Sequence, residues 1–405
     1  MEKLVLFGAG KIGRSFIGQL FSRSGYEVIF VDINKLLIEE LNRQGLYNVI
    51  IIKSEKEEKL VVNNVRGIHA GDVEIVSDEI SDAGILAVSV GIRGLTDVMP
   101  IIAKSLLRRF ELGNHEPVDI IIAENMRNAA GFFRRELYRL LPESYPLDKL
   151  VGLVETSIGK MVPIMLKKDL AEDILQVFAE PYNTLILDKK AFKNAIPDVK
   201  GLDPKENMKA WSDRKLFIHN LGHAAVAYYS YTYDNKFIYP WQALHVPEIY
   251  DFVRKTMLQA ADMLIAAYPA EFTPESLTEH IDDLLVRFCN KSLGDTIFRV
   301  GCDLIRKLGP EDRIVGAMRM AQSMNMPYDR ILYILVCACH FRATDENGKM
   351  LDEDVEFVSL YEKGLRDVLI AVCGFDEKHD KELIALVEKL ENSFQGRQGK
   401  WQKPG

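Results

Sequence analysis

Residues 3–32 read KLVLFGAGKIGRSFIGQLFSRSGYEVIFVD, and the order of features in this stretch determines the predicted fold. A short aliphatic run, residues 3–7, enters a glycine-rich turn, and apolar residues then recur at helical spacing until Gly25. A second apolar run, residues 26–32, follows and ends in an aspartate. Strand, glycine turn, helix and strand in this order predict the start of a doubly wound α/β sheet.

The alternation of strands and helices continues through the N-terminal part of the chain. Helices are expected at residues 35–43 and 95–109, and further apolar runs predict strands at residues 49–53, 59–62, 85–90 and 118–123. Continuous apolar runs of this kind are typical of strands that are buried on both faces of a parallel sheet.

The C-terminal part has a different pattern. Apolar residues recur there at helical spacing, over residues 247–268, 312–322, 329–339 and 354–373. We therefore predict an α/β Rossmann domain with a doubly wound, mostly parallel sheet over residues 1–195, followed by a mainly α-helical substrate and catalytic domain over residues 196–395. The polar, Gly-rich residues 396–405 are expected to be a disordered tail.

Composition argues against several classes of protein. A chain of 405 residues with 48% hydrophobic and 27% charged residues is typical of a globular protein with two domains. A net charge of −8 disfavours nucleic acid as a partner. We expect a cytoplasmic protein without membrane contact, because the chain shows neither a signal peptide nor an apolar run of membrane-spanning length. Its five cysteines are not expected to form disulfides.

The glycine turn is a candidate cofactor site. Gly8, Gly10 and Gly13 form a G-x-G-x-x-G pattern between a strand and a helix, where backbone amides and the helix dipole favour a pyrophosphate. Asp32 ends the second strand, where a carboxylate would bind ribose hydroxyls and repel a 2′-phosphate, so NAD is favoured over NADP. The predicted cofactor-binding residues are Gly8, Ala9, Gly10, Lys11, Ile12, Gly13, Asp32, Val90, Gly91, Glu124 and Asn125. For Glu124 and Asn125, a simple role in capping the next helix is an equally good interpretation.

The segment DRKLFIHNLGHAAVAYY, residues 213–229, carries the candidate catalytic group. Lys215, Asn220 and His223 would share an arc of ~140° on an α-helix and could face one cleft. Oxidation of an alcohol needs a base for the hydroxyl proton and donors for the oxygen, and these three residues supply both without a metal. By spacing alone, a solvated lysine, a capping asparagine and a core histidine would be as good an interpretation.

Several ordered motifs together make a family recognisable. They are FGAGKIGRSFIG (residues 7–18), VDIN (31–34), AENM (123–126), RKLFIHNLGHA (214–224), RVGCDLIRKL (299–308) and HFR (340–342). With these motifs the chain resembles the polyol-specific long-chain dehydrogenases, the mannitol dehydrogenase family, nearly from end to end. The sequence departs from the pattern of that family at Gly159-Lys160, where Asp-Arg is expected, and at Leu185, where a tryptophan is expected.

The resemblance implies a metal-independent dehydrogenase with NAD as cofactor. It assigns Lys215 as the general base and Asn220 and His223 as the residues that orient the substrate oxygen. The implied reaction is the reversible oxidation of D-mannitol 1-phosphate to D-fructose 6-phosphate. The alternatives are a dehydrogenase of an unphosphorylated polyol or of a hexuronate-derived acid such as altronate, and, more remotely, a non-catalytic NAD-binding sensor.

The expected partner is a small polyol or sugar phosphate, and a phosphate would need cations. The candidate substrate-binding residues are Lys160, Arg299, Arg306, His340 and Arg342, and Lys307 is a further cation available for the phosphate. For any single one of the cations Arg299, Arg306, Lys307 and Arg342, an ordinary surface or helix-terminal charge is the better interpretation, and only the group suggests a phosphate site. Cys337, Cys339 and His340 lack the second half of a zinc site, so no metal is expected.

Overall fold

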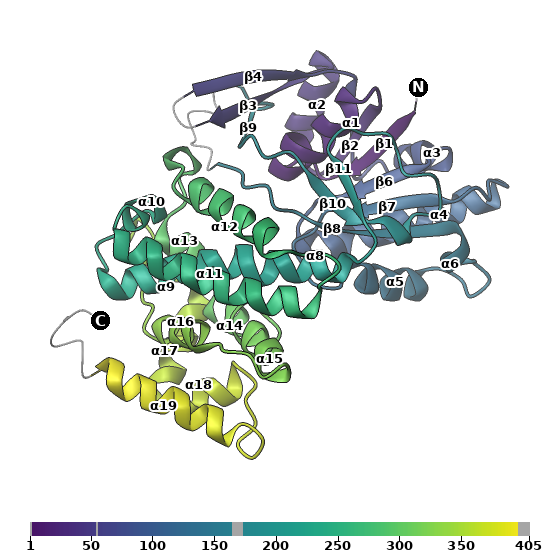
Figure 1. Ribbon diagram of the computed structural model, residues 1–405. Coiled ribbons are helices and arrows are strands. Elements are labelled where there is room, and N and C mark those ends of the chain that lie inside the picture. Colours follow the sequence, from purple (N-terminus) through teal and green to yellow (C-terminus); the bar gives the residue numbers. More distant parts are fainter. Residues whose placement is uncertain (1, 54–55, 164–172, 396–405) are drawn as a thin grey trace. The chain divides into compact units, whose positions relative to one another are not determined.

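The computed structural model describes residues 2–53, 56–163 and 173–395 (Figure 1). The chain divides into two compact units, residues 1–212 and 213–405. The predicted tail, residues 396–405, lies outside the described residues. No helix within the described part of the chain is long and apolar enough to cross a membrane.

The first unit is built on an eight-stranded sheet with the order β11-β10-β8-β7-β6-β1-β2-β5. Its strands are β1 (Lys3–Phe7), β2 (Glu27–Asp32), β5 (Val65–His69), β6 (Ile85–Val88), β7 (Val118–Ile122), β8 (Val151–Ser157), β10 (Leu185–Asp188) and β11 (Leu202–Lys205). Six neighbouring strands of this sheet are parallel, namely β8, β7, β6, β1, β2 and β5. Strand β10 pairs with β8 in the antiparallel sense. This doubly wound order confirms the predicted fold class.

Alternate residues of the buried strands enter two separate cores. In β1, Leu4 and Leu6 belong to one core, whereas Val5 and Phe7 belong to the other. The first core also contains side chains of the wide π-helical turn Gly13–Gly18, α1 (Gln19–Arg23) and α2 (Lys35–Gln44). The second core contains side chains of the helices α3 (Val73–Ser81), α4 (Leu95–Glu111), α5 (Ala129–Leu140) and α6 (Leu147–Leu150).

A smaller sheet has the order β4-β3-β9. It contains β3 (Tyr47–Lys53), β4 (Lys56–Val62) and β9 (Val177–Ala179), and β3 and β4 pair in the antiparallel sense. Residues 49–53 and 59–62 therefore form strands as predicted, but their assignment to a buried parallel sheet was wrong. The physical reason is the charge of β4, whose first four residues, KEEK, are exposed to solvent.

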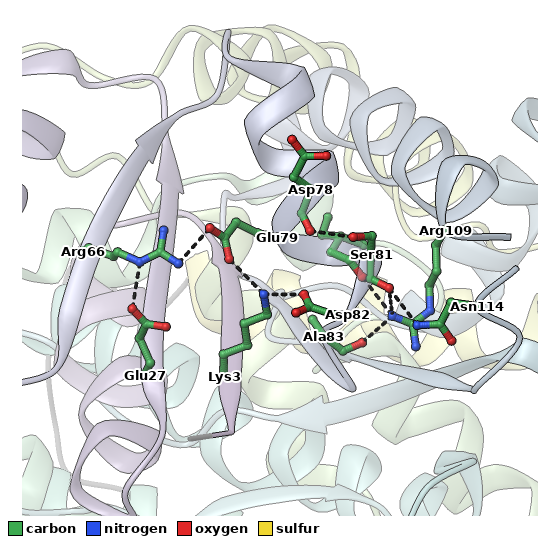
Figure 2. Close-up of polar contacts among 11 residues, drawn as sticks. Lys3, Glu27, Arg66, Asp78, Glu79, Ser81, Asp82, Ala83, Arg109 and Asn114 are labelled. Atoms are coloured by element: carbon green, nitrogen blue, oxygen red, sulfur yellow. Dashed lines mark hydrogen bonds and ion pairs between the residues drawn. The ribbon is translucent and has the colours of Figure 1, made fainter. Parts of the chain in front are cut away.

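Polar side chains tie together the amino ends of the large sheet (Figure 2). Lys3 at the start of β1 pairs with Asp82 and, at 2.9 Å, with Glu79. Arg66 of β5 joins Glu79 to Glu27 at the start of β2, with both N–O distances at 2.8 Å. The opposite edge, at the carboxyl ends of the strands, is where doubly wound sheets bind their ligands.

The second unit is helical, as predicted. Its helices, together with α8 at the end of the first unit, are α8 (Met208–Arg214), α9 (Leu221–Tyr233), α10 (Pro240–Leu244), α11 (Pro247–Ala267), α12 (Pro274–Phe288), α13 (Ile297–Gly301), α14 (Leu304–Lys307), α15 (Val315–Ser323), α16 (Asp329–Cys339), α17 (Asp352–Lys363), α18 (Leu365–Ala371) and α19 (Lys381–Gln395). The central helix is α9, which packs against α11, α13 and α16 and is buried over most of its length. The helix predicted over residues 354–373 is instead two helices, because the chain is extended at Gly364.

Candidate active site

The glycine turn after β1 has the shape of a phosphate cradle. A Cβ atom on Gly8, whose φ is +98°, would lie 2.2 Å from the carbonyl oxygen of Ser89, and one on Gly13 would lie 2.0 Å from the carbonyl oxygen of Gly8. At Gly10, by contrast, no heavy atom of the described residues lies within 4 Å of such a Cβ. Gly8 and Gly13 therefore allow tight packing of the turn, while Gly10 leaves its outer side open for a ligand.

The flanks of this turn also agree with a dinucleotide site. Asp32, at the carboxyl end of β2, accepts the backbone N–H of Ala9 at 2.7 Å and that of Asn34 at 2.8 Å. Ala9 is buried, Lys11 is exposed, and Ile12 packs against the core beneath the turn. The Asp32 carboxylate thus lies directly beside the glycine turn.

Three further predicted residues meet at the ends of β6 and β7. Glu124 is buried, and its carboxylate accepts the backbone N–H groups of Val90 at 2.7 Å and Gly91 at 3.0 Å. Burial raises the pKa of Glu124, although the two N–H groups act in the opposite direction. Glu124 therefore fixes the loop after β6, and the exposed Asn125 beside it is the better placed of the two to meet a cofactor.

One carboxylate at the same edge of the sheet was missed in the sequence. Glu155 of β8 pairs in register with Ile122, the last residue of β7, and accepts the N–H of Ala129 at 3.3 Å. Burial raises the pKa of Glu155. Its position at the carboxyl end of a parallel strand was the available signal.

The predicted catalytic residues lie on one continuous helical segment in the second unit. Lys215 and Asn220 are the first and last residues of a wide π-helical turn, and His223 lies in the first turn of α9. The segment is not α-helical throughout, as was predicted, because between Lys215 and Asn220 a π turn, with backbone hydrogen bonds between residues five apart, replaces the α-helix. His223 stacks on Phe288 with ring centroids 4.0 Å apart, which fixes the orientation of its imidazole.

The charges around this segment lower the pKa values of its basic residues. Burial, reinforced by the Arg313 guanidinium, lowers the pKa of Lys215 to about 8. Burial, together with Arg313 and Lys307, lowers the pKa of His223 to about 3, so this imidazole is neutral at physiological pH. Part of Lys215 can therefore be an uncharged amine near neutral pH. The neutral His223 can offer either an N–H donor or a ring-nitrogen acceptor.

Lys307 and Arg313 form the cationic surroundings of this site. Both are buried, with 6% and 7% of their surface exposed. Lys307 donates to the carbonyl oxygen of Val300 at 2.7 Å, and Arg313 donates to Asp312 at 2.7 Å. Burial, with Arg313 as a further cause, lowers the pKa of Lys307 to about 8. The sequence suggested Lys307 as one of the cations available for a phosphate, and it missed Arg313.

The predicted substrate-binding residues lie in different surroundings. The charges of Arg299 and Arg306 act on this site, Arg299 on His223 and Arg306 on Lys307. They are exposed and also form ion pairs, Arg299 with Asp295 and Arg306 with Asp303.

The other three predicted substrate-binding residues are held by groups of their own unit. Lys160, in the first unit, donates to the carbonyl oxygen of Tyr182 at 2.7 Å. His340 pairs with Glu391 at 2.8 Å, and Arg342 donates to the carbonyl oxygens of Cys339 and Phe341 at the end of α16. No metal-ligand cluster of three His, Cys, Asp or Glu side chains occurs among the described residues.

A small cavity lies beside His223 in the second unit. Its volume is about 10 Å³, which is room for one water molecule, and Trp241, Asn290 and Asp295 are among the residues that line it. The side of the His223 ring is thus open to a small polar group.

Comparison with known proteins identifies the family of this chain. Residues 2–201 match the family described as Mannitol dehydrogenase Rossmann domain, and residues 207–390 match Mannitol dehydrogenase C-terminal domain. The chain belongs to the mannitol dehydrogenase family. The resemblance seen in the sequence motifs is thereby confirmed.

Two curated members of the mannitol dehydrogenase family are similar over nearly their whole length. The mannitol-1-phosphate 5-dehydrogenase of Bacillus licheniformis is 32% identical over 92% of this chain and 96% of its own. The mannitol-1-phosphate 5-dehydrogenase of Lactococcus lactis subsp. lactis is 32% identical over 97% of this chain and 100% of its own.

Two solved structures have the same fold. A substrate-free D-sorbitol dehydrogenase superposes with a TM-score of 0.81 at 17% identity, over 98% of this chain and 93% of its own. Mannitol 2-dehydrogenase of Pseudomonas fluorescens, solved as a ternary complex with NAD and D-mannitol, gives a TM-score of 0.74 at 15% identity, over 97% and 92% of the two chains. Both similarities support the fold described above.

Proposed function

We propose that this member of the mannitol dehydrogenase family catalyses the reversible, NAD-dependent and metal-independent oxidation of D-mannitol 1-phosphate to D-fructose 6-phosphate. Family membership makes the chain a polyol dehydrogenase. The observation that supports mannitol 1-phosphate as the substrate is the 32% identity to two mannitol-1-phosphate 5-dehydrogenases, which extends over nearly the whole chain.

The first unit offers a site that fits NAD. The open side of Gly10 and the tight packing at Gly8 and Gly13 suit a diphosphate, and Asp32 suits the ribose hydroxyls beside it. The Asp32 carboxylate would repel the 2′-phosphate of NADP. When bound, NAD supplies the acceptor for the hydride that leaves the substrate carbon.

In the second unit we assign Lys215 as the general base. With a pKa of about 8, about one tenth of Lys215 is uncharged at neutral pH, against well under one thousandth for an ordinary lysine. The free amine takes the hydroxyl proton of the substrate, and Asn220 and the neutral His223 hold the oxygen as it becomes a carbonyl. In the reverse direction Lys215 returns the proton to the alkoxide.

The phosphate of the substrate requires positive charge near this group. We assign that role to Arg299, Lys307 and Arg313, because the charges of all three act on His223 and two of them are buried. A bound phosphate would compensate the charge of Lys307 in particular, a buried cation whose Nζ donates to the carbonyl oxygen of Val300. Lys160, Arg306, His340 and Arg342 already donate to or pair with groups of their own unit, so their roles in substrate binding stay predictions, to be tested by single substitutions.

The test is an assay of NADH oxidation with fructose 6-phosphate, fructose, tagaturonate and fructuronate in parallel, repeated with NADPH. Turnover with fructose 6-phosphate and NADH, and with no other pair, is the expected result. Activity with only fructose or a uronate would show that the enzyme acts on a different substrate of the same family. No turnover with any substrate, together with intact NAD binding, would favour the non-catalytic sensor.

A further inference from the structure

Arg14 is a buried arginine beneath the glycine turn. It follows Gly13 directly, and only 5% of its surface is exposed. Its Nε donates to the carbonyl oxygen of Ala9 at 2.7 Å, and one Nη donates to Ile174 O and Leu175 O at 3.1 and 2.6 Å. Arg14 therefore connects the glycine turn to the segment that leads into β9.

The peptide groups of Ala9 are held from both sides. Asp32 accepts the Ala9 N–H at 2.7 Å, while Arg14 donates to the Ala9 carbonyl at 2.7 Å. Arg14 is itself anchored, because its carbonyl accepts the hydroxyl of the fully buried Tyr47 at 2.7 Å. The orientation of the Ala9 peptide groups thus depends on the Asp32 carboxylate on one side and on the Arg14 guanidinium on the other.

The charge of Arg14 is not balanced by an ion pair. All its side-chain hydrogen bonds go to carbonyl oxygens, and no carboxylate among residues 2–53, 56–163 and 173–395 pairs with it. Burial lowers the pKa of this guanidinium, and Asp32 acts on it only through its field. A buried cation without a partner is costly, so a diphosphate on the adjoining turn would be attracted to it.

We propose that Arg14 is a positioning residue for the dinucleotide cofactor, and this inference rests on the proposed use of NAD. Through the Ala9 carbonyl, Arg14 holds the glycine turn with its amides available to the diphosphate. Its buried charge also attracts the diphosphate from below the turn, without direct contact.

The test compares Arg14→Gln and Arg14→Lys with a matched control, Arg109→Gln. Arg109 is equally buried, with 4% of its surface exposed, and also donates to carbonyl oxygens, those of Ile80, Ser81 and Ala83 (Figure 2). It lies at the amino ends of the strands, away from the glycine turn, so its loss costs stability and leaves the cradle intact. Dissociation constants for NAD, ADP-ribose and adenosine, kcat at saturating NAD, and Tm are measured for each protein.

Arg14→Gln should weaken binding of NAD and ADP-ribose by about tenfold to hundredfold, the size of one charged interaction. Adenosine binding should change little, kcat should stay within about threefold, and Arg14→Lys should recover part of the loss. Arg109→Gln should lower Tm with unchanged dissociation constants.

NAD binding by Arg14→Gln equal to that of the wild type would overturn the inference, and so would an equal loss of adenosine binding. If Arg14→Gln does not fold, Arg14→Lys and Tyr47→Phe decide, since both disturb the anchoring of the turn and keep the charge. Both variants should bind ADP-ribose more weakly than the wild type and bind adenosine equally well. Unchanged binding of ADP-ribose, or an equal loss of adenosine binding, would refute the role of Arg14. A wild-type protein that does not bind NAD would refute the proposed function itself, and this inference with it.

Discussion

Replacing Arg313 by glutamine should move the pH dependence of the proposed oxidation of mannitol 1-phosphate to higher pH. Lys215 must be uncharged to take the hydroxyl proton, so the oxidation rate should rise with pH through the pKa of this lysine. The buried Arg313 charge is one of the two causes that lower this pKa, and glutamine removes the charge while it keeps a shorter, polar side chain. Without Arg313, a higher pH is needed to reach the same fraction of free amine.

The size of the change is limited by the larger cause. The pKa of Lys215 is lowered from 10.5 to about 8, and burial contributes more than Arg313. The substitution should therefore restore less than half of the difference, which moves the midpoint to no higher than about 9. At neutral pH the uncharged fraction of Lys215 would then fall from about one tenth to about one hundredth.

The assay is kcat/KM for oxidation at saturating NAD, measured from about pH 6 to about pH 10. Arg319→Gln is the control, because Arg319 lies on α15 a few residues further along and forms an ion pair with Asp380. Its midpoint should equal that of the wild type. A midpoint that stays near pH 8 in Arg313→Gln would refute the electrostatic role of Arg313, and a wild-type profile without a midpoint near pH 8 would refute Lys215 as the base.

Three further substitutions test the remaining assignments. Lys215→Met should lower turnover by about a thousandfold while NAD still binds, and unchanged turnover would exclude Lys215 as the base. The same variant should gain up to about 3 kcal/mol of stability at neutral pH in denaturant unfolding, because the lowered pKa of about 8 means that charged Lys215 opposes folding. Since the unfolded chain binds more protons between about pH 8 and 10.5, wild-type stability should rise across that window and the advantage of the variant should disappear. Asp32→Ser should improve the ratio of NADPH to NADH turnover by about tenfold or more, measured as kcat/KM, and an unchanged ratio would show that Asp32 does not select the cofactor. His340→Ala should lower Tm, because it breaks the contact with the buried Glu391, and should leave the KM for fructose 6-phosphate unchanged; a raised KM would instead support the predicted substrate role.

The fold was predictable where the sequence pattern is local. A continuous apolar strand such as residues 118–122 can be stable only when both faces are buried, which already implies a sheet covered by helices. The β3 and β4 hairpin was assigned to the wrong sheet because each run, taken alone, suits either a parallel or an antiparallel partner. Only the exposed charges at residues 56–59 distinguished the two.

The candidate site was predictable only in part. Lys215, Asn220 and His223 stand out because their chemistry and order are unusual on an apolar helix. Arg313 and the burial of Lys307 could not be foreseen, since a cation gives no local sign of whether tertiary packing will remove it from water. The same limit applies to Arg342, whose bonds to the carbonyl oxygens at the end of α16 depend on the way that helix ends.

The wide turn from Lys215 to Asn220 places a constraint on evolutionary change in this region. A π turn closes its backbone hydrogen bonds over residues five apart and an α-helix over residues four apart, so the turn can lose a residue only by becoming ordinary α-helix. Substitutions inside the turn, between Lys215 and Asn220, need only preserve packing, whereas the loss of a residue would remove the turn itself. Relatives that keep this turn should therefore vary in sequence between Lys215 and Asn220 and have the same number of residues there.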